Sequence, residues 1–192
     1  RRPTEQVTGP RERLQFDVPD ELRQLVETDN SSVSRQESLA AAFVVYLARL
    51  AGSRHFHVWF GHESLLAAGG DFSRLCMPAV PLEIQAGKES SCRELLEHVL
   101  LTMQQARQRG NLAREVFARY PEYRVPAGAM GIQVDVPGEQ QTLAAAWPVF
   151  LQFSAGKNAS VFELLYAPAV VDETVVRSVG NGFRVFLDGM RS

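Results

Sequence analysis

Two histidines separated by one residue are the first candidates for chemistry in this chain. His55 and His57 belong to an aromatic and β-branched run that predicts a strand over 55–60. Because side chains alternate along a strand, both imidazoles are expected on one face, at a spacing that lets two imidazoles bind one metal ion. A third ligand would have to be His62 or a carboxylate from a distant segment. Nothing in the sequence requires one, so surface or interface histidines are favoured and no metal site is predicted.

The other reactive side chains lie outside recognised catalytic patterns. Cys76 and Cys92 have no Cys/His setting and are expected to be reduced, partly buried thiols. Ser64 and Ser73 are not part of a Gly-x-Ser-x-Gly elbow. His98 is expected to be a solvated residue of a helix. The sequence therefore predicts no catalytic residue and no directly bound cofactor.

Composition narrows the class of protein. With 192 residues, of which 45% are apolar and 22% charged, the chain has the composition of a globular protein of one large or two small domains. The net charge of -2 and the absence of a Lys/Arg block argue against nucleic-acid binding. No apolar run approaches a membrane span and no signal-like segment stands at the start, so a cytoplasmic protein is expected. Because the first residue is Arg1, we expect a piece of a longer protein.

The clearest helix signal is a capping box at Ser34 and Glu37. The helix is predicted over 39–50, with Gly52 at its left-handed C-terminal stop. Its predicted buried stripe is Leu39, Ala42, Phe43, Tyr46, Leu47 and Leu50. A second capping box, at Ser91 and Glu94, predicts a helix that extends to about residue 109.

Short apolar runs predict the strands. They cover 14–18, 55–60, 77–84, 130–136, 149–153 and 161–166. Pro78 and Pro81 favour an edge strand or a bulge over 77–84, because proline cannot donate to a β-ladder. Shorter helices are predicted over 19–26 and 112–119. Mixed helices and strands without internal repeats predict an α/β or α+β sheet covered on at least one side.

The end of the chain combines a strand over 161–166 with a helix that begins at Asp172. Tyr166 adds a polar tip to the strand, and the helix repeats an apolar side at Val175, Val176, Val179, Phe183, Phe186 and Leu187. This ending resembles that of nonribosomal peptide synthetase condensation domains: apolar strand, Tyr, a few residues, Phe-Asp and a helix.

Upstream motifs extend this resemblance over about 14–190. Residues 39–52 match the family phrase Leu-Ala-Ala-Ala-Phe-x-x-Tyr-Leu-Ala-Arg-Leu-x-Gly. In the family, the next strand usually ends in Val-Gly, and here this end corresponds to Trp59-Phe60-Gly61. The Pro-Leu segment that follows after a loop corresponds to Pro81-Leu82. Residues 117–121 match the Phe-x-x-x-Arg-Tyr-Pro element approximately. In this order, the motifs resemble the C-terminal lobe of a condensation domain.

The resemblance implies an α/β lobe with a chloramphenicol-acetyltransferase-like fold, a mixed sheet packed by helices. Residues 1–13 would be an interlobe linker and 14–192 the C-terminal lobe, a single domain. Such a lobe forms part of a substrate tunnel and a docking surface for peptidyl or aminoacyl carrier proteins, whose phosphopantetheine arms deliver the substrates for amide formation. The family's catalytic His-His-x-x-x-Asp-Gly belongs to the N-terminal lobe and is absent here, so this chain alone is expected to be inactive.

Six residues are candidates for the interlobe surface or the tunnel: Pro78, Pro81, Val136, Pro137, Gly138 and Trp147. The loop 136–143 corresponds to a segment that crosses to the partner lobe as a latch, and a long hairpin connection is an equally good interpretation. Trp147 could instead pack inside its own lobe.

Two departures from the family pattern keep other functions open. The Arg expected after the Val-Gly strand is missing after Gly61, and the Asn that usually precedes the Pro-Leu segment is replaced around Pro78. These departures would fit a divergent or inactive member. The alternatives are a non-catalytic protein-interaction module and part of a trans-acting acyltransferase of the same superfamily. Neither nucleic acid nor membrane is an expected partner.

Overall fold

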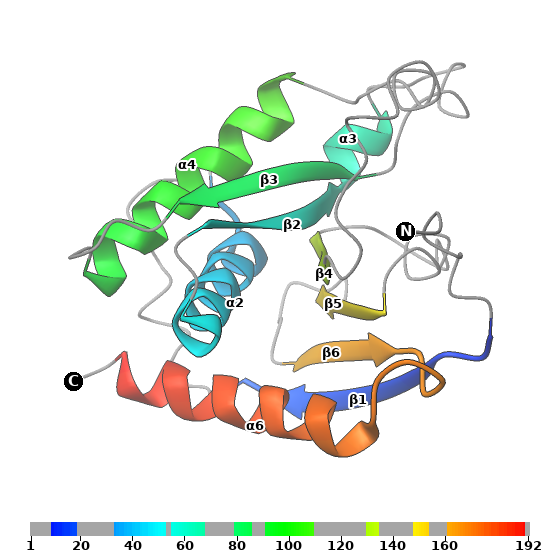
Figure 1. Cartoon of the computed structure of the whole chain (residues 1–192). Helices are drawn as coiled ribbons and strands as arrows, with labels where there is room; N and C mark the ends of the chain where they lie inside the picture. Colours follow the sequence, from blue (N-terminus) through cyan, green and yellow to red (C-terminus); the bar gives the residue numbers. More distant parts are fainter. Residues whose placement is uncertain are drawn as a thin grey trace.

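A computed structural model describes residues 9–18, 33–52, 55–67, 79–85, 91–109, 130–134, 148–153 and 161–190. The helices and strands are β1 (Glu12–Asp17), α2 (Arg35–Ala51), β2 (His55–His62), α3 (Glu63–Ala67), β3 (Val80–Gln85), α4 (Cys92–Arg109), β4 (Met130–Val134), β5 (Val149–Phe153), β6 (Val161–Tyr166) and α6 (Glu173–Gly189) (Figure 1). The helices predicted over 19–26 and 112–119 lie outside the described residues. No helix of the described part is long and apolar enough to cross a membrane.

The strands form one mixed sheet in the order β1-β6-β5-β4-β2-β3. β4 pairs with β2 and β5 in parallel, and the remaining neighbours are antiparallel. The predicted mixed sheet is therefore confirmed. β3 lies at the edge, as the prolines of the segment predicted, and Pro81 is paired with Trp59 there.

One face of the sheet packs against the three long helices. An unbroken apolar row crosses all six strands on this face through Leu14, Leu164, Leu151, Ile132, Phe60 and Val80. These strands share one buried cluster with Phe43 of α2, Val99 of α4 and Phe183 of α6. In Figure 1, α6 lies along β1 and β6 and α4 lies beside β3. This continuous core holds the sheet rigid and leaves its other face outside the helix layer.

The capping box of α2 is confirmed in both directions. Glu37 N–H donates to Ser34 Oγ at 3.1 Å, and Ser34 N–H donates to Glu37 Oε2 at 2.9 Å. Gly52 ends the helix with φ 58°, the left-handed conformation that glycine adopts without strain. The prediction that Leu50 is buried was wrong, because Leu50 is 58% exposed. Its neighbours 49 and 51 are exposed as well, so the last turn of α2 extends beyond the core.

α6 begins at Asp172, whose side chain accepts the Thr174 N–H as a helix N-cap. The predicted stripe holds at Val176, Phe183 and Leu187, which are buried. Val175 was wrongly assigned to it and is 53% exposed, because one step around a helix moves a side chain by about 100°.

The core also includes a position that the apolar pattern missed. Gly180 is buried on α6, and a methyl group built on it would lie 2.2 Å from Phe16 Cζ. The stacked rings of Phe16 and Phe162 occupy that space, with centroids 5.1 Å apart. A glycine is therefore required here by the close approach of α6 to β1.

Candidate functional site

The face of the sheet away from the helices carries a row of polar side chains on four adjacent strands. The strand register places Gln15, Glu163, Gln152 and Gln133 next to one another on β1, β6, β5 and β4. Glu163 and Gln133 are buried, and Gln152 is half-buried. Amides and carboxylates persist at buried positions only where hydrogen bonds replace their water. These four residues, called the polar row below, are the main candidate for a functional site on this face.

Glu163 has an ion-pair partner on the neighbouring strand β1. Arg13 Nη1 donates to Glu163 Oε1 at 3.4 Å, and the two side chains are 52% and 10% exposed. An ion pair with one partner in solvent stabilises a fold by at most about 1 kcal/mol. The contact therefore serves mainly to orient the Glu163 carboxylate.

The polar row was missed by reasoning from the sequence, although a signal for it is visible. Three strands that otherwise read as apolar each contain one polar residue at an alternate position: Gln133, Gln152 and Glu163. Central strands buried on both faces are normally continuous apolar runs. The polar interruptions thus indicated one special face, but only the register shows that they align.

A second cluster, on the helix side, connects the end of β2 to two helices. Glu37 Oε1 accepts from Arg107 Nη1 at 2.6 Å and lies 3.9 Å from His62 Nε2. The Glu37 and His62 side chains are both almost completely buried. Because Arg107 belongs to α4, one buried carboxylate ties together α2, α4 and β2.

His62 contacts Ser64 through its other ring nitrogen. Nδ1 accepts the Ser64 N–H at 3.0 Å and lies 2.8 Å from Ser64 Oγ. Since an N–H points at Nδ1, the neutral ring carries its proton on Nε2. The imidazole therefore caps the start of α3 as an Asp or Ser side chain does. A Ser-His-acid triad needs the reverse assignment, with Nε2 at the serine and Nδ1 at the acid, so this cluster is structural.

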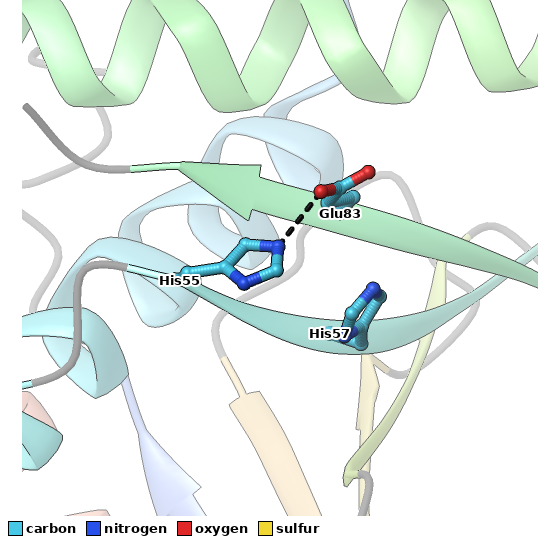
Figure 2. A group of neighbouring side chains, drawn as sticks. All are labelled: His55, His57 and Glu83. Atoms are coloured by element: carbon cyan, nitrogen blue, oxygen red, sulfur yellow. Dashed lines mark hydrogen bonds and ion pairs between the residues drawn. The ribbon is translucent and has the colours of Figure 1, made fainter. Parts of the chain in front are cut away.

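The predicted pair His55 and His57 gains a third neighbour in the folded chain (Figure 2). Glu83 of β3 lies directly opposite His57, and its Oε1 is 2.7 Å from His55 Nε2. Gln85 Nε2 donates to the same carboxylate oxygen at 3.0 Å. These bonds from Gln85 and His55 lower the pKa of Glu83 below its usual value. The third neighbour is therefore a carboxylate from a distant segment of the chain.

The six candidates for the interlobe surface or the tunnel fall mostly outside the described part of the chain. Pro78, Val136, Pro137, Gly138 and Trp147 lie outside the described residues. The partly buried Pro81 lies on the edge strand, on the same face as the polar row and beside the buried Trp59.

Two reactive residues of the sequence analysis lie on α4. Cys92 is a half-buried free thiol in its first turn, as expected, whereas Cys76 lies outside the described residues. His98 is exposed, also as expected.

Comparison with known proteins identifies the fold. The sequence matches no family model, and none of the curated proteins matches it. A holo four-domain nonribosomal peptide synthetase bound to AMP and glycine aligns with 94% of this chain and 17% of its own, at TM-score 0.70 and 12% identity. The first condensation domain of the calcium-dependent antibiotic synthetase, in complex with a substrate analogue, aligns over 97% and 46%, at TM-score 0.64 and 14% identity. The chain has the fold of a condensation-domain lobe.

A third similar structure comes from a complex. The X-domain complex with OxyB from teicoplanin biosynthesis aligns over 98% of this chain and 47% of that chain, at TM-score 0.64 and 14% identity. The chain spans 43–47% of the single condensation domains that it matches. That extent is consistent with one lobe, the C-terminal lobe that the sequence motifs resemble.

Proposed function

We propose that this chain is the C-terminal lobe of a nonribosomal peptide synthetase condensation domain. In this role it forms part of the substrate tunnel and of the carrier-protein docking surface for peptide-bond formation. The main support for the proposal is the length of the structural match. Almost the whole of this chain aligns with the similar structures, but it covers under half of each condensation domain. The same segment contains the ordered sequence motifs of that lobe.

The composition of the sheet supports this role. A lobe that contributes a wall to a tunnel needs one face built for packing and another that meets substrate or protein. The helix-covered face supplies the first. On the opposite face, the exposed Gln15 and the partly buried Gln152 and Pro81 are suited to the second, whereas Gln133 and Glu163 are already buried within this chain. Gln133 lies only three residues before Val136, so β4 leads from the polar row into the segment that resembles the latch.

The proposed division of labour leaves the catalytic base to the N-terminal lobe. None of the four histidines in this sequence is adjacent to another, so the His-His signature must come from the partner. Carrier proteins are the other partners, and their phosphopantetheine arms bring the substrates. A cytoplasmic location belongs to the same proposal. We expect no amide formation by the chain alone, because positioning between two lobes provides much of the rate.

The test is reconstitution with a separately produced catalytic lobe of a condensation domain that carries the His-His-x-x-x-Asp-Gly motif. We expect saturable association by calorimetry, and amide formation from carrier-loaded donor and acceptor only when both lobes are present. Pro81→Arg should weaken association at least about tenfold, because it places a charge on the proposed lobe-facing surface. The matched control is Val185→Arg, at an exposed position of α6 on the helix side.

Three results would count against the proposal. Turnover by the chain alone would show that it contains its own base. Absence of association at high micromolar concentration would show a self-contained domain. Equal effects of the two arginine substitutions, with unchanged thermal midpoints, would place the interface elsewhere.

A non-catalytic interaction module is the second candidate function. It is favoured by the structure of the X-domain in a complex with OxyB, which has a similar fold. By analogy, this lobe would recruit a second protein without joining substrates. Binding of a neighbouring synthetase domain, together with inactivity in the presence of a catalytic lobe, would support this candidate over the first.

A further inference from the structure

The cluster of His55, His57 and Glu83 results from the register of two strands. His57 is paired with Glu83, and His55 is paired with Gln85, two residues further along the ladder. All four side chains point away from the helices, because the alternate pairs Phe56–Ile84 and Val58–Leu82 supply the core side. Figure 2 shows both imidazoles and the carboxylate on the same side of β2 and β3.

The ligand atoms of the three residues are close enough to share one ion. One donor atom from each residue lies within 4.8 Å of the others, and His55 Nε2 lies 2.7 Å from Glu83 Oε1. A tetrahedral zinc ion with bonds of about 2.0–2.2 Å keeps its ligand atoms roughly 3.3–3.6 Å apart. Opening the His55–Glu83 contact by less than about 1 Å, and closing a separation of up to 4.8 Å by at most about 1.5 Å, brings the three ligand atoms to this spacing.

We propose that His55, His57 and Glu83 form a surface Zn²⁺ site with three protein ligands. Neutral imidazole with one carboxylate is a ligand set that late first-row divalent ions prefer, whereas Mg²⁺ and Ca²⁺ prefer oxygen ligands alone. A fourth position faces solvent and takes water or a side chain of another protein. This site is independent of the function proposed for the lobe.

Two further features make the cluster more than a chance group of surface residues. Gln85 holds the Glu83 carboxylate from the side, as an outer hydrogen-bond partner of a metal ligand does. The ligands are also mounted on paired strands whose opposite side is locked in the core, so their backbone positions are fixed before an ion binds.

The expected site is exchangeable and is not part of the folded core. The His55 and Glu83 side chains are 56% and 54% exposed, and closed structural zinc sites use four ligands. Zinc would therefore bind more weakly than in such sites, and the chain folds without it. Since the ligands come from β2 and the edge strand β3, a bound ion would hold the outermost strand pair together.

The test is calorimetric titration of the full 192-residue chain with ZnCl₂ in a non-coordinating buffer with a non-thiol reductant. We expect one zinc per chain, and no heat with MgCl₂. His57→Gln and Glu83→Gln should each weaken zinc binding at least about tenfold, because each removes one of three ligands. The matched control is His98→Gln, which removes an exposed histidine of α4 outside the cluster and should leave binding unchanged.

Further measurements test whether Cys92 binds the zinc and whether the variants are correctly folded. Cys92→Ser should retain the site, and the circular dichroism and zinc-free thermal midpoint of each variant should match those of the parent. In addition, zinc at a concentration that saturates the parent should raise the thermal midpoint of the parent more than that of Glu83→Gln. The proposal is overturned if Glu83→Gln binds zinc like the parent, if Cys92→Ser abolishes binding, or if His98→Gln weakens it as much as His57→Gln.

Discussion

One row on the helix-covered face is apolar from one edge of the sheet to the other, whereas one row on the opposite face carries polar side chains on four adjacent strands. The row from Leu14 to Val80 contains no polar residue, but the row from Gln15 to Gln133 contains three glutamines and a glutamate. The same strands supply both rows, because successive side chains point to opposite faces. The difference lies in what each face must contact.

This comparison shows where the fold obtains its stability and where function is to be sought. Apolar burial dominates folding, and the helix side provides it in one continuous cluster. Polar groups in the middle of a sheet add little net stability and lose water, so packing alone does not favour them. Substitutions on the helix side should therefore affect stability, and those on the polar side should affect partners. The predictions below test that separation.

The largest effect is expected from truncation of a central ring of the helix side. Phe43 is fully buried and contacts Phe183 edge-to-face, with centroids 4.9 Å apart. Phe43→Ala should lower the free energy of unfolding by about 3–5 kcal/mol through lost burial and the cavity left behind. Urea denaturation followed by circular dichroism measures this, with Leu50→Ala on the exposed turn of α2 as the control. Similar losses for both variants would mean that the core is misassigned.

A smaller effect should follow from adding one methyl group between α6 and β1. Gly180→Ala forces the Phe16 ring aside and should cost about 1–3 kcal/mol as overpacking, of which better helix propensity recovers about 1 kcal/mol. At Gly182 the new methyl would meet only the hydroxyl end of the half-buried Tyr46, at 2.3 Å, and at Gly189 nothing lies within 4 Å.

The order of thermal midpoints measures this glycine series. Gly180→Ala should be lowest, Gly182→Ala intermediate and Gly189→Ala equal to or above the parent. A Gly180→Ala midpoint at or above the parent would contradict the close approach of α6 to β1.

On the polar side, the loss of an ion pair should barely change stability. Arg13→Ala removes the partner of Glu163 and should cost less than about 1 kcal/mol, since Arg13 is mostly in solvent. Equilibrium unfolding in urea measures this change in the free energy of unfolding. The matched control is Arg177→Ala, which removes the exposed ion pair with Glu173 on α6. A loss comparable to that of Phe43→Ala would show that the polar side also carries folding energy.

A further effect should appear only at alkaline pH. Tyr166 Oη donates to Glu12 Oε2 at 2.6 Å, and this hydrogen bond, with burial, raises the pKa of Tyr166 to about 12 from 10.0. Between these values the unfolded chain loses the phenol proton while the folded chain keeps it, so stability falls as pH rises. Below pH 10 the contribution is fully present.

Tyr166→Phe isolates this contribution. The difference in unfolding free energy between the parent and the variant should be constant up to about pH 10 and then shrink toward pH 12. Urea unfolding at a series of pH values measures it, and other titrating groups cancel in the difference. Parallel curves across this range would show that the hydrogen bond does not form.

The sequence by itself determined the local features of this protein. Ser34 with Glu37 and Gly52 set the two ends of α2, and the prolines marked β3 as an edge strand, because capping, left-handed φ and the missing N–H act within a few residues. The ordered motifs resembling condensation domains indicated the fold class, which the mixed sheet and the similar structures confirm.

Only the tertiary structure decided what lies across the chain. It placed Glu83 beside His55, 28 residues away, aligned the polar row across four strands, and left Val175 and Leu50 in solvent. Strand order and register depend on contacts between distant segments. The burial of one helical residue depends on whether a neighbouring element of the fold covers it. A repeating pattern of residue types specifies a face, but not the surface that the face meets.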